Sequence, residues 1–237
     1  MGTPDTSGTP GTSVVIGGSG GLGRAVAGRF AGRGDSVVVT SRDAERARAT
    51  AEEIGGASRG LAVDLSRPGT IAAALADVAE VDRLVLTAME PAPNSLAEFD
   101  VDSAVRAVTV KLVGYAESVR ALRDRLRPGA AVVLFGGMAK ERPYPGSTMI
   151  TTFNAGLSGL VKTLAVEMAP HRVNALHPGV VGDSPRWREV NDHPHARRTP
   201  IGRLVTMDEI VDATDFLLRN GGMNGHDLHV DGGLLAA

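Results

Sequence analysis

The sequence predicts a single α/β domain in which helices cover both faces of a mostly parallel sheet. Short β-branched runs alternate with helical patterns, and a glycine-rich turn joins the first strand to the first helix. The length of 237 residues, of which 43% are hydrophobic, suits one substantial core. We therefore expect residues 13–237 to form one doubly wound domain, preceded by a disordered leader at 1–12 that is rich in Gly, Pro, Ser and Thr.

Seven strands are expected, because the first strand at 13–16 is followed by six further short apolar runs. Helical stretches separate these runs, as they do in parallel sheets. The six runs are 36–40, 60–63, 83–87, 131–135, 172–176 and 228–230.

Two long helices and one long loop are expected in the second half of the chain. The stretch 150–168 repeats apolar residues every three or four positions and ends at Ala169-Pro170, and a second helix is expected at 103–126. The polar, proline-containing stretch 182–200 is predicted to be a functional or mobile loop on the substrate side.

The turn after the first strand carries the clearest chemical information. Glycines at 17, 21 and 23 allow a sharp turn and a close approach of the backbone to a pyrophosphate, which then faces a helix N-terminus. Residues with this expected role are Gly17, Ser19, Gly20, Gly21, Leu22 and Gly23. A glycine-rich turn without a ligand is the alternative.

Composition argues against several classes of partner. The formal net charge of −2 makes nucleic acid an unexpected partner, and the sequence has neither an apolar stretch of about 20 residues nor a signal-peptide pattern. A cytoplasmic protein without membrane contact is therefore expected. Zero cysteines exclude thiolate chemistry, and the pairs His193-x-His195 and His226-x-x-His229 lack an evident third ligand, so no metal site is predicted.

Five motifs, in this order and spacing, resemble the short-chain dehydrogenase/reductase family from about residue 14 to residue 233. They are Gly17-x-x-x-Gly21-x-Gly23, Asp64-Leu65, Gly159-Leu160-x-Lys162-x-Leu164-Ala165-x-Glu167-Met168-Ala169-Pro170, Arg172-Val173-Asn174-Ala175-x-x-Pro178-Gly179 and Val230-Asp231-Gly232-Gly233. The resemblance implies a single-domain Rossmann fold with a nicotinamide cofactor. It also implies a homodimer or homotetramer that forms through the helices at 103–126 and 150–168.

The resemblance favours NADP(H) over NAD(H). The second strand ends in Ser41-Arg42, and no carboxylate occurs until Asp43, so a guanidinium is available for the extra phosphate. A solvated Arg42 at a helix start is the alternative. By the same resemblance, the other cofactor residues are Asp64, Leu65, Thr87, Ala88, Met89, Asn154, Pro178, Gly179 and Val180.

The resemblance breaks at the catalytic positions. Counted back from Gly159-Leu160, the family's tyrosine and lysine fall on Ile150 and Asn154, its serine falls on Gly137, and its asparagine falls on Lys111. A reduced carbonyl leaves an alkoxide that must be protonated, and a positioned general acid typically contributes about 10²–10⁴-fold. Neither Ile150 nor Gly137 has a side chain that can donate a proton.

Lys111 is the candidate catalytic residue, because it is the one substituted position that gains an ionisable group. Burial or a neighbouring positive charge would lower its pKa and make it a proton donor. Tyr115 lies four residues later and could pair with it, although interface packing is the commoner role of an aromatic side chain on a helix.

Substrate contacts are expected from Met138, Tyr144, Arg186 and Trp187. Arg186 and Trp187 suit an anionic or aromatic substrate, and a solvated loop is the alternative. His177, next to Pro178, is interpreted as a structural residue near the nicotinamide end.

Three functions are compatible with these residues. The first is an NADP(H)-dependent oxidoreductase that acts on a small carbonyl, enone or imine. The second is a non-redox enzyme, such as a cyclase, dehydratase or isomerase, that uses the same pocket. The third is a nucleotide-binding scaffold or regulator without chemistry.

Overall fold

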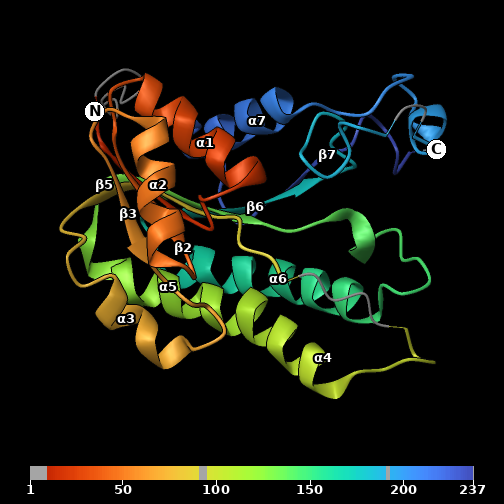
Figure 1. Ribbon diagram of the computed structural model, residues 1–237, viewed down its shortest axis with the longest axis horizontal. Coiled ribbons are helices and arrows are strands. Elements are labelled where there is room, and N and C mark those ends of the chain that lie inside the picture. The colour runs from red at the N-terminus through yellow and green to blue at the C-terminus, as the bar shows by residue number, and fades with distance from the viewer. Residues whose placement is uncertain (1–9, 91–94, 191–192, 237) are drawn as a thin grey trace.

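The computed structural model describes residues 10–90, 95–190 and 193–236. These residues form a seven-stranded, entirely parallel sheet in the order β3-β2-β1-β4-β5-β6-β7. Helices α1, α2 and α7 lie on one face of the sheet, and α3, α4, α5 and α6 lie on the other (Figure 1). The predicted doubly wound fold is confirmed.

The strands are β1 (Thr12–Ile16), β2 (Ser36–Ser41), β3 (Ser58–Ala62), β4 (Val81–Leu86), β5 (Leu126–Phe135), β6 (Arg172–Pro178) and β7 (Asp227–Val230). The α-helices are α1 (Gly21–Gly32), α2 (Ala44–Ile54), α3 (Ile71–Ala74), α4 (Val101–Val108), α5 (Gly114–Leu122), α6 (Thr148–Glu167) and α7 (Met207–Arg219). Short helical turns lie at Pro68–Thr70, Arg123–Arg125, Met138–Lys140 and Ala196–Arg198, and a π-helical turn lies at Thr109–Val113.

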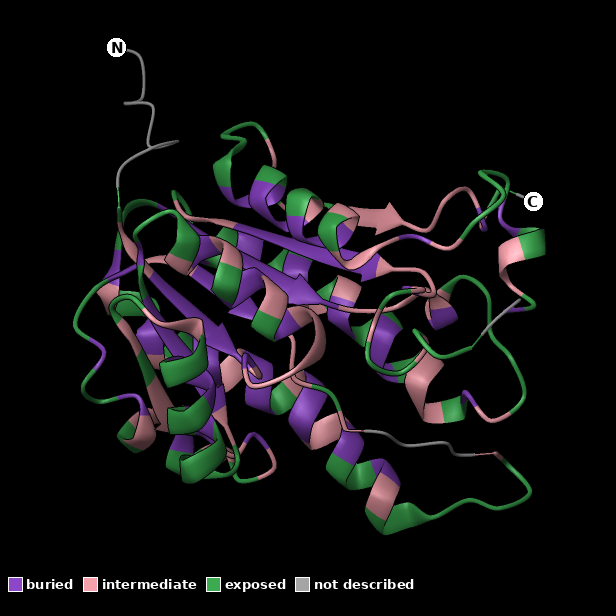
Figure 2. Ribbon diagram, turned by 45° about the horizontal axis from the view of Figure 1, so that its top comes forward, coloured by how far each residue is buried: buried purple, intermediate pink, exposed green. Residues whose placement is uncertain are grey.

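Two hydrophobic layers hold the sheet between its helices. Successive strand residues point to opposite faces, so Val14 and Ile16 pack in the layer with α3, α5 and α6, whereas Val15 packs in the layer with α1, α2 and α7. Figure 2 shows the buried strands enclosed by helices whose outer sides are exposed. Burial on both faces explains why the strands appear in the sequence as continuous apolar runs.

The first strand begins earlier than expected, at Thr12, within the range 1–12 predicted as a leader. Asp35 accounts for this, because its buried carboxylate accepts hydrogen bonds from Gly11 N at 3.0 Å and Ser13 Oγ at 2.6 Å and pairs with Arg83 at 2.7 Å. Residues 1–9 of the predicted leader lie outside the described residues.

The helix expected at 103–126 differs from the observed one. It begins at Val101, because the Asp100 side chain accepts hydrogen bonds from the backbone N–H groups of Asp102 and Ser103. It then widens into the π-helical turn Thr109–Val113 before α5. Leu126, the last residue of the expected helix, instead opens β5.

The order of the strands creates a crevice between β1 and β4. The chain moves outward from β1 to β2 and β3, then returns to the other side of β1 with β4, so the connections after β1 and β4 diverge to opposite faces. In open parallel sheets, ligands bind at such a switch point, beyond the carboxyl ends of the strands. Within the described part of the chain, none of the helices has the length and apolar character needed to cross a bilayer.

Gly60 provides a test of how closely α2 packs on the sheet. A Cβ at this position of β3 would collide with the backbone of Ala47 in α2. Gly60→Ala should therefore lower the free energy of unfolding by about 1–3 kcal/mol, measured by urea unfolding. Gly69→Ala, where a Cβ would meet open space, is the matched control. Equal stability of the two variants would contradict this packing.

Candidate functional site

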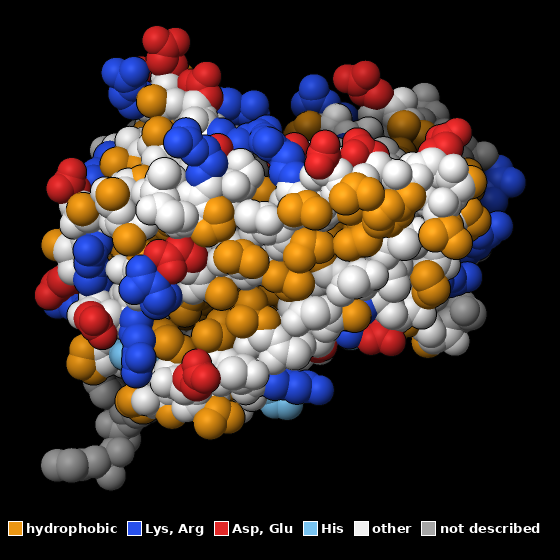
Figure 3. Space-filling model, turned by 90° about the horizontal axis from the view of Figure 1, so that it is seen from below, with side chains coloured by type: hydrophobic (Ala, Val, Ile, Leu, Met, Phe, Trp, Pro, Cys, Tyr) orange, Lys and Arg blue, Asp and Glu red, His pale blue; other side chains and the backbone are white. Residues whose placement is uncertain are grey.

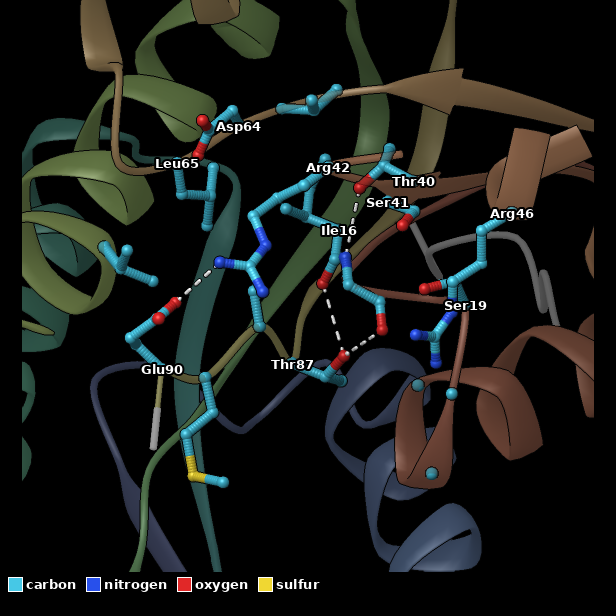
Figure 4. Close-up of a pocket in the computed structure, with 18 of the residues that line it drawn as sticks. Ile16, Ser19, Thr40, Ser41, Arg42, Arg46, Asp64, Leu65, Thr87 and Glu90 are labelled. Carbon is cyan, nitrogen blue, oxygen red and sulfur yellow. Dashed lines mark hydrogen bonds and ion pairs between the residues drawn. The ribbon is translucent and has the colours of Figure 1, made fainter. Parts of the chain in front are cut away.

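A cleft of about 460 Å³ lies beyond the carboxyl ends of β1, β2 and β4 (Figure 4). Most of the predicted cofactor residues line it. They are Gly17, Ser19, Gly20, Gly21, Leu22, Gly23, Ser41, Arg42, Asp64, Leu65, Thr87, Ala88 and Met89. The predicted residues Asn154, Pro178, Gly179 and Val180 are not part of this lining.

The glycine turn fits tightly between the ends of β1 and β4. Gly17 has a φ of 84°, in the left-handed region that favours glycine, and a Cβ there would lie 2.7 Å from Ala88 N. A Cβ on Gly23 would lie 2.5 Å from the carbonyl oxygen of Gly17 and would also collide with Thr87 Oγ1. Thr87 Oγ1 donates to the Ile16 and Gly17 carbonyls at 3.2 Å. The absence of side chains thus leaves the start of α1 open to a phosphate.

Two arginines line the cleft, one just after β2 and one in the first turn of α2. Arg42 Nη1 donates to Glu90 Oε2 at 3.0 Å across the cleft, and Arg106 Nε lies 3.3 Å from the other oxygen of the same carboxylate. Arg46, in the first turn of α2, also lines the cleft. Its backbone N–H donates to the Asp43 side chain at 2.8 Å, which caps the helix.

Sequence reasoning missed several residues of this lining, namely Ile16, Thr40, Asp43, Arg46, Val63, Glu90 and Val110. Arg46 lies four residues after Arg42, in the first turn of α2, and a second arginine so close to the end of β2 was an available signal. Glu90 had no local signal, because only the adjacency of β2, β1 and β4 brings it to Arg42.

Asp64 is the predicted adenine-binding carboxylate, and its charge is stabilised locally. Burial alone would raise the pKa of this carboxyl group. Hydrogen bonds from Ser66 Oγ at 2.7 Å and Ser66 N at 2.9 Å, together with the positive charges of Arg106 and Arg42, outweigh burial, and the pKa is lowered.

Lys111 and Tyr115 form a buried pair behind the cleft. Lys111 Nζ lies 3.0 Å from Tyr115 Oη, and Tyr115 Oη donates to the Ala88 carbonyl at 2.8 Å. Lys111 is 4% exposed, in the π-helical turn, and Tyr115 is fully buried. Interface packing, the commoner role considered for Tyr115, is therefore wrong, because its side chain is in the core of one chain. The structure brings the pair together, although neither residue lines the cleft.

Burial changes the proton affinity of both groups. It lowers the pKa of Lys111 from 10.5 to about 7, since the charged ammonium loses hydration. It raises the pKa of the Tyr115 phenol well above its usual value of 10, so the phenol stays neutral. Lys111 can therefore gain or lose a proton near neutral pH, with the carbonyl of a cleft residue, Ala88, 3.5 Å from its Nζ.

Gly137, Asn154 and Ile150 are the other positions at which the resemblance predicts replaced catalytic residues. Gly137 and Asn154 are adjacent, since a Cβ on Gly137 would lie 3.2 Å from Asn154 Nδ2, and Asn154 is buried at 3% exposure. Ile150 packs with Phe153 and Ala107 in a small apolar cluster between α6 and α4.

His177 holds the loop that carries Gly137. Its Nδ1 accepts a hydrogen bond from Gly137 N at 3.1 Å, so its Nε2 carries the proton and donates to Asp227 Oδ1 at 3.2 Å. Burial lowers the pKa of His177 to about 4, despite the opposing effect of Asp227, and the ring is neutral. The geometry agrees with the structural role expected for His177.

The four predicted substrate residues do not gather in the described cleft. Met138 begins a short helix after β5, and Tyr144 is 54% exposed. Arg186 stacks over Trp187, with its Cζ 4.7 Å from the ring centroid, and Trp187 meets His193 edge-on at 4.7 Å. These last contacts give the 182–200 loop a local aromatic cluster. Among the residues that the structure describes, no group of three His, Asp or Glu side chains has the geometry of a metal site.

The fold and the cleft together define a doubly wound α/β protein of the Rossmann class. A family model described as Enoyl-(Acyl carrier protein) reductase matches residues 17–235. The chain belongs to the short-chain dehydrogenase/reductase family, a family of oxidoreductases.

Relatives match nearly the whole chain. Carbonyl reductase family member 4 of Xenopus tropicalis is 32% identical over 229 residues, which cover 93% of this chain and 96% of the relative. The 3-oxoacyl-(acyl-carrier-protein) reductase of Rattus norvegicus is 28% identical over 228 residues, with coverage of 93% and 96%. A crystal structure of a short-chain dehydrogenase from Burkholderia cenocepacia J2315 in complex with NADP is 27% identical, with a TM-score of 0.86 and coverage of 96% and 98%.

Lys111 provides a pH test of the buried pair. Because its folded-state pKa is about 7 and its unfolded-state value is near 10.5, the unfolded chain binds more protons between these pH values. The free energy of unfolding should therefore rise with pH in this window and fall towards pH 7. Relative to Lys111→Met, the native protein should gain about 1.4 kcal/mol per pH unit between pH 8 and 9 in urea unfolding.

Lys162→Met, at an exposed position of α6, is the matched control for this measurement. If the native protein and Lys111→Met gave parallel stability profiles, the lowered pKa of Lys111 would be excluded.

Proposed function

We propose that the chain is an NADP(H)-dependent oxidoreductase that transfers hydride to or from a small organic carbonyl, enone or imine. The observation that carries this proposal is the cleft at the switch point, which an open glycine turn shares with Arg42, just after β2, and Arg46, in the first turn of α2. The backbone at Gly17 and Gly23 leaves room for a pyrophosphate, and the guanidinium groups suit an additional phosphate. The NADP bound by the Burkholderia cenocepacia neighbour supports the same choice.

The proposed catalytic site departs from that of the family. Gly137, Ile150 and Asn154 stand where the family's serine, tyrosine and lysine are expected, so the usual phenolic acid is replaced. A bound NADPH would supply the hydride. Lys111 is the proposed source of the proton, because its pKa of about 7 is suited to general acid catalysis at neutral pH. Its hydrogen-bond contact with Ala88 places it directly behind the cleft wall.

A non-catalytic dinucleotide-binding protein is the second candidate. The burial of Lys111 and Tyr115, neither of which lines the cleft, favours this alternative. A binder needs the glycine turn and the arginines, but it needs no proton donor.

Turnover separates the two candidates. The purified protein should first bind NADPH in a fluorescence titration, and it should then oxidise NADPH in the presence of a carbonyl, an enone or an imine. Lys111→Met should slow this turnover by about 10² -fold or more, and the native rate of reduction should decline as the pH rises through about 7, since the acid form is lost.

Lys162→Met should keep the native rate. NADPH binding without turnover on any of the three substrate types would support the second candidate, and absence of NADPH binding would contradict both.

We also propose that the protein is a homodimer or homotetramer. Hydrophobic side chains form a band on the face of the molecule that α4, α5 and α6 cover (Figure 3). Exposed valines contribute to this face from α4, the π-helical turn and α6, namely Val101, Val105, Val113 and Val166. A contiguous apolar face of this kind is typical of a surface that a protein partner covers.

Light scattering should give a molar mass of two or four times 24.5 kDa. Val105→Glu should lower this mass, because a carboxylate would be desolvated in the interface. Ala49→Glu, on the exposed side of α2 across the sheet, should not lower it. A native mass of one chain would contradict the proposal.

A further inference from the structure

Asn154 is a buried side chain whose amide has no hydrogen-bond partner. It lies in α6 and is 3% exposed. Within the part of the chain that the structure describes, its amide neither donates nor accepts a hydrogen bond. Asn174 in β6 shows the contrast, because its buried amide donates to Met223 O at 2.9 Å and accepts from His226 N at 3.1 Å. A buried amide without a partner costs free energy and is rare in folded proteins, so Asn154 requires an explanation.

The amide of Asn154 is directed at Gly137, just after β5. A Cβ on Gly137 would lie 3.2 Å from Asn154 Nδ2, so the amide faces the space that a side chain at position 137 would occupy. The backbone N–H groups beside it are already engaged. Gly137 N donates to His177 Nδ1 at 3.1 Å, and Gly136 N donates to the Leu176 carbonyl at 2.8 Å. A ligand that reaches this loop would therefore meet the amide of Asn154 rather than a backbone N–H.

Gly137 lies next to the cleft along the carboxyl edge of the sheet. Leu86 in β4 pairs with Leu134 in β5. Met89 and Gly137 each follow three residues later, and Met89 lines the cleft. A dinucleotide lies across the crevice at the switch point. Because the predicted adenine-binding residue Asp64 follows β3, the reactive half of the cofactor would lie beyond β4 and β5, where it approaches the loop of Gly137.

We infer that Asn154 donates a hydrogen bond from its side-chain amide to the oxygen of a carbonyl substrate, in the space beside Gly137. This inference rests on the proposed function and narrows its substrate class. It also changes the role expected for Asn154 from the sequence, which was a contact with the cofactor. The amide is outside the lining of the cofactor cleft, and it faces a bare glycine instead.

A neutral donor at this place favours a carbonyl over an iminium. When hydride from a bound NADPH adds to a carbonyl carbon, the π electrons move to the oxygen, which gains negative charge and then takes the proton assigned to Lys111. An N–H group held at that oxygen stabilises the developing charge. In the reduction of an iminium, the nitrogen passes from positive to neutral, so the same donor gains no interaction as the charge changes.

Steady-state kinetics of Asn154→Leu test this assignment. The variant should lower kcat/KM for a ketone by about 10²–10³-fold, the effect of losing one donor to a developing oxyanion. Its Kd for NADPH should equal the native value in a fluorescence titration, because the amide contacts the substrate and not the cofactor. The native protein should reduce the ketone faster than a cyclic iminium of similar size.

Urea unfolding gives a readout that a structural role would move in the opposite direction. Asn154→Leu should raise the urea midpoint, because an apolar side chain removes the cost of the unpartnered amide. Asn174→Leu is the matched control and should lower the midpoint, because it leaves Met223 O and His226 N without their partners.

Each contrary outcome has a distinct meaning. A lower midpoint for Asn154→Leu, native turnover of the ketone by this variant, or a loss of NADPH affinity that accounts for the loss of turnover would overturn the assignment of Asn154. Faster reduction of the iminium by the native protein would overturn the substrate class. A native protein that binds NADPH and reduces none of the substrates would instead contradict the proposed function.

Discussion

The close fit of the glycine turn between β1 and β4 is the constraint on which the site depends. Gly17 meets the backbone of Ala88, and Gly23 meets the carbonyl of Gly17, so the first helix starts directly against the ends of two strands. Any side chain at either position would separate these elements. Because they touch, the N-terminus of α1 faces the crevice where the strand order reverses, and the residues that follow β2, β3 and β4 converge on one cleft.

The same convergence explains why the chemistry of the site divides into two parts. The cleft itself carries exposed cationic groups, which suit a phosphorylated dinucleotide. Behind its wall, the π-helical turn directs Lys111 inward, where it meets Tyr115 and the carbonyl of Ala88. Charging a lysine that is buried away from water costs free energy. Burial therefore lowers the pKa of Lys111 to about 7, so that its proton can dissociate near neutral pH. The proposed cofactor binding and the proposed proton transfer thus depend on two different groups of residues near the end of β4.

Much of the fold could be predicted because local sequence patterns determine the strands and the glycine turn. The apolar runs located the seven strands, and the glycine spacing located the turn. Errors occurred where a long-range contact decided the outcome. Asp35 draws Gly11 and Ser13 towards Arg83 and extends β1, and this ion pair joins residues 48 positions apart. The predicted substrate contacts Met138, Tyr144, Arg186 and Trp187 are outside the lining of this cleft and stay a prediction.

The sequence by itself determined that the chain is a doubly wound α/β protein with a glycine turn, a basic end to β2 and a lysine at position 111. These properties follow from residue type and from spacing along the chain. Only the tertiary structure decided that Arg42 meets Glu90 while Arg46 faces the glycine turn, and that Lys111 is buried against Tyr115. The physical reason is that charge pairing and desolvation depend on which groups are close in space. The order of the strands in the sheet, rather than the order of residues along the chain, determines which groups are close.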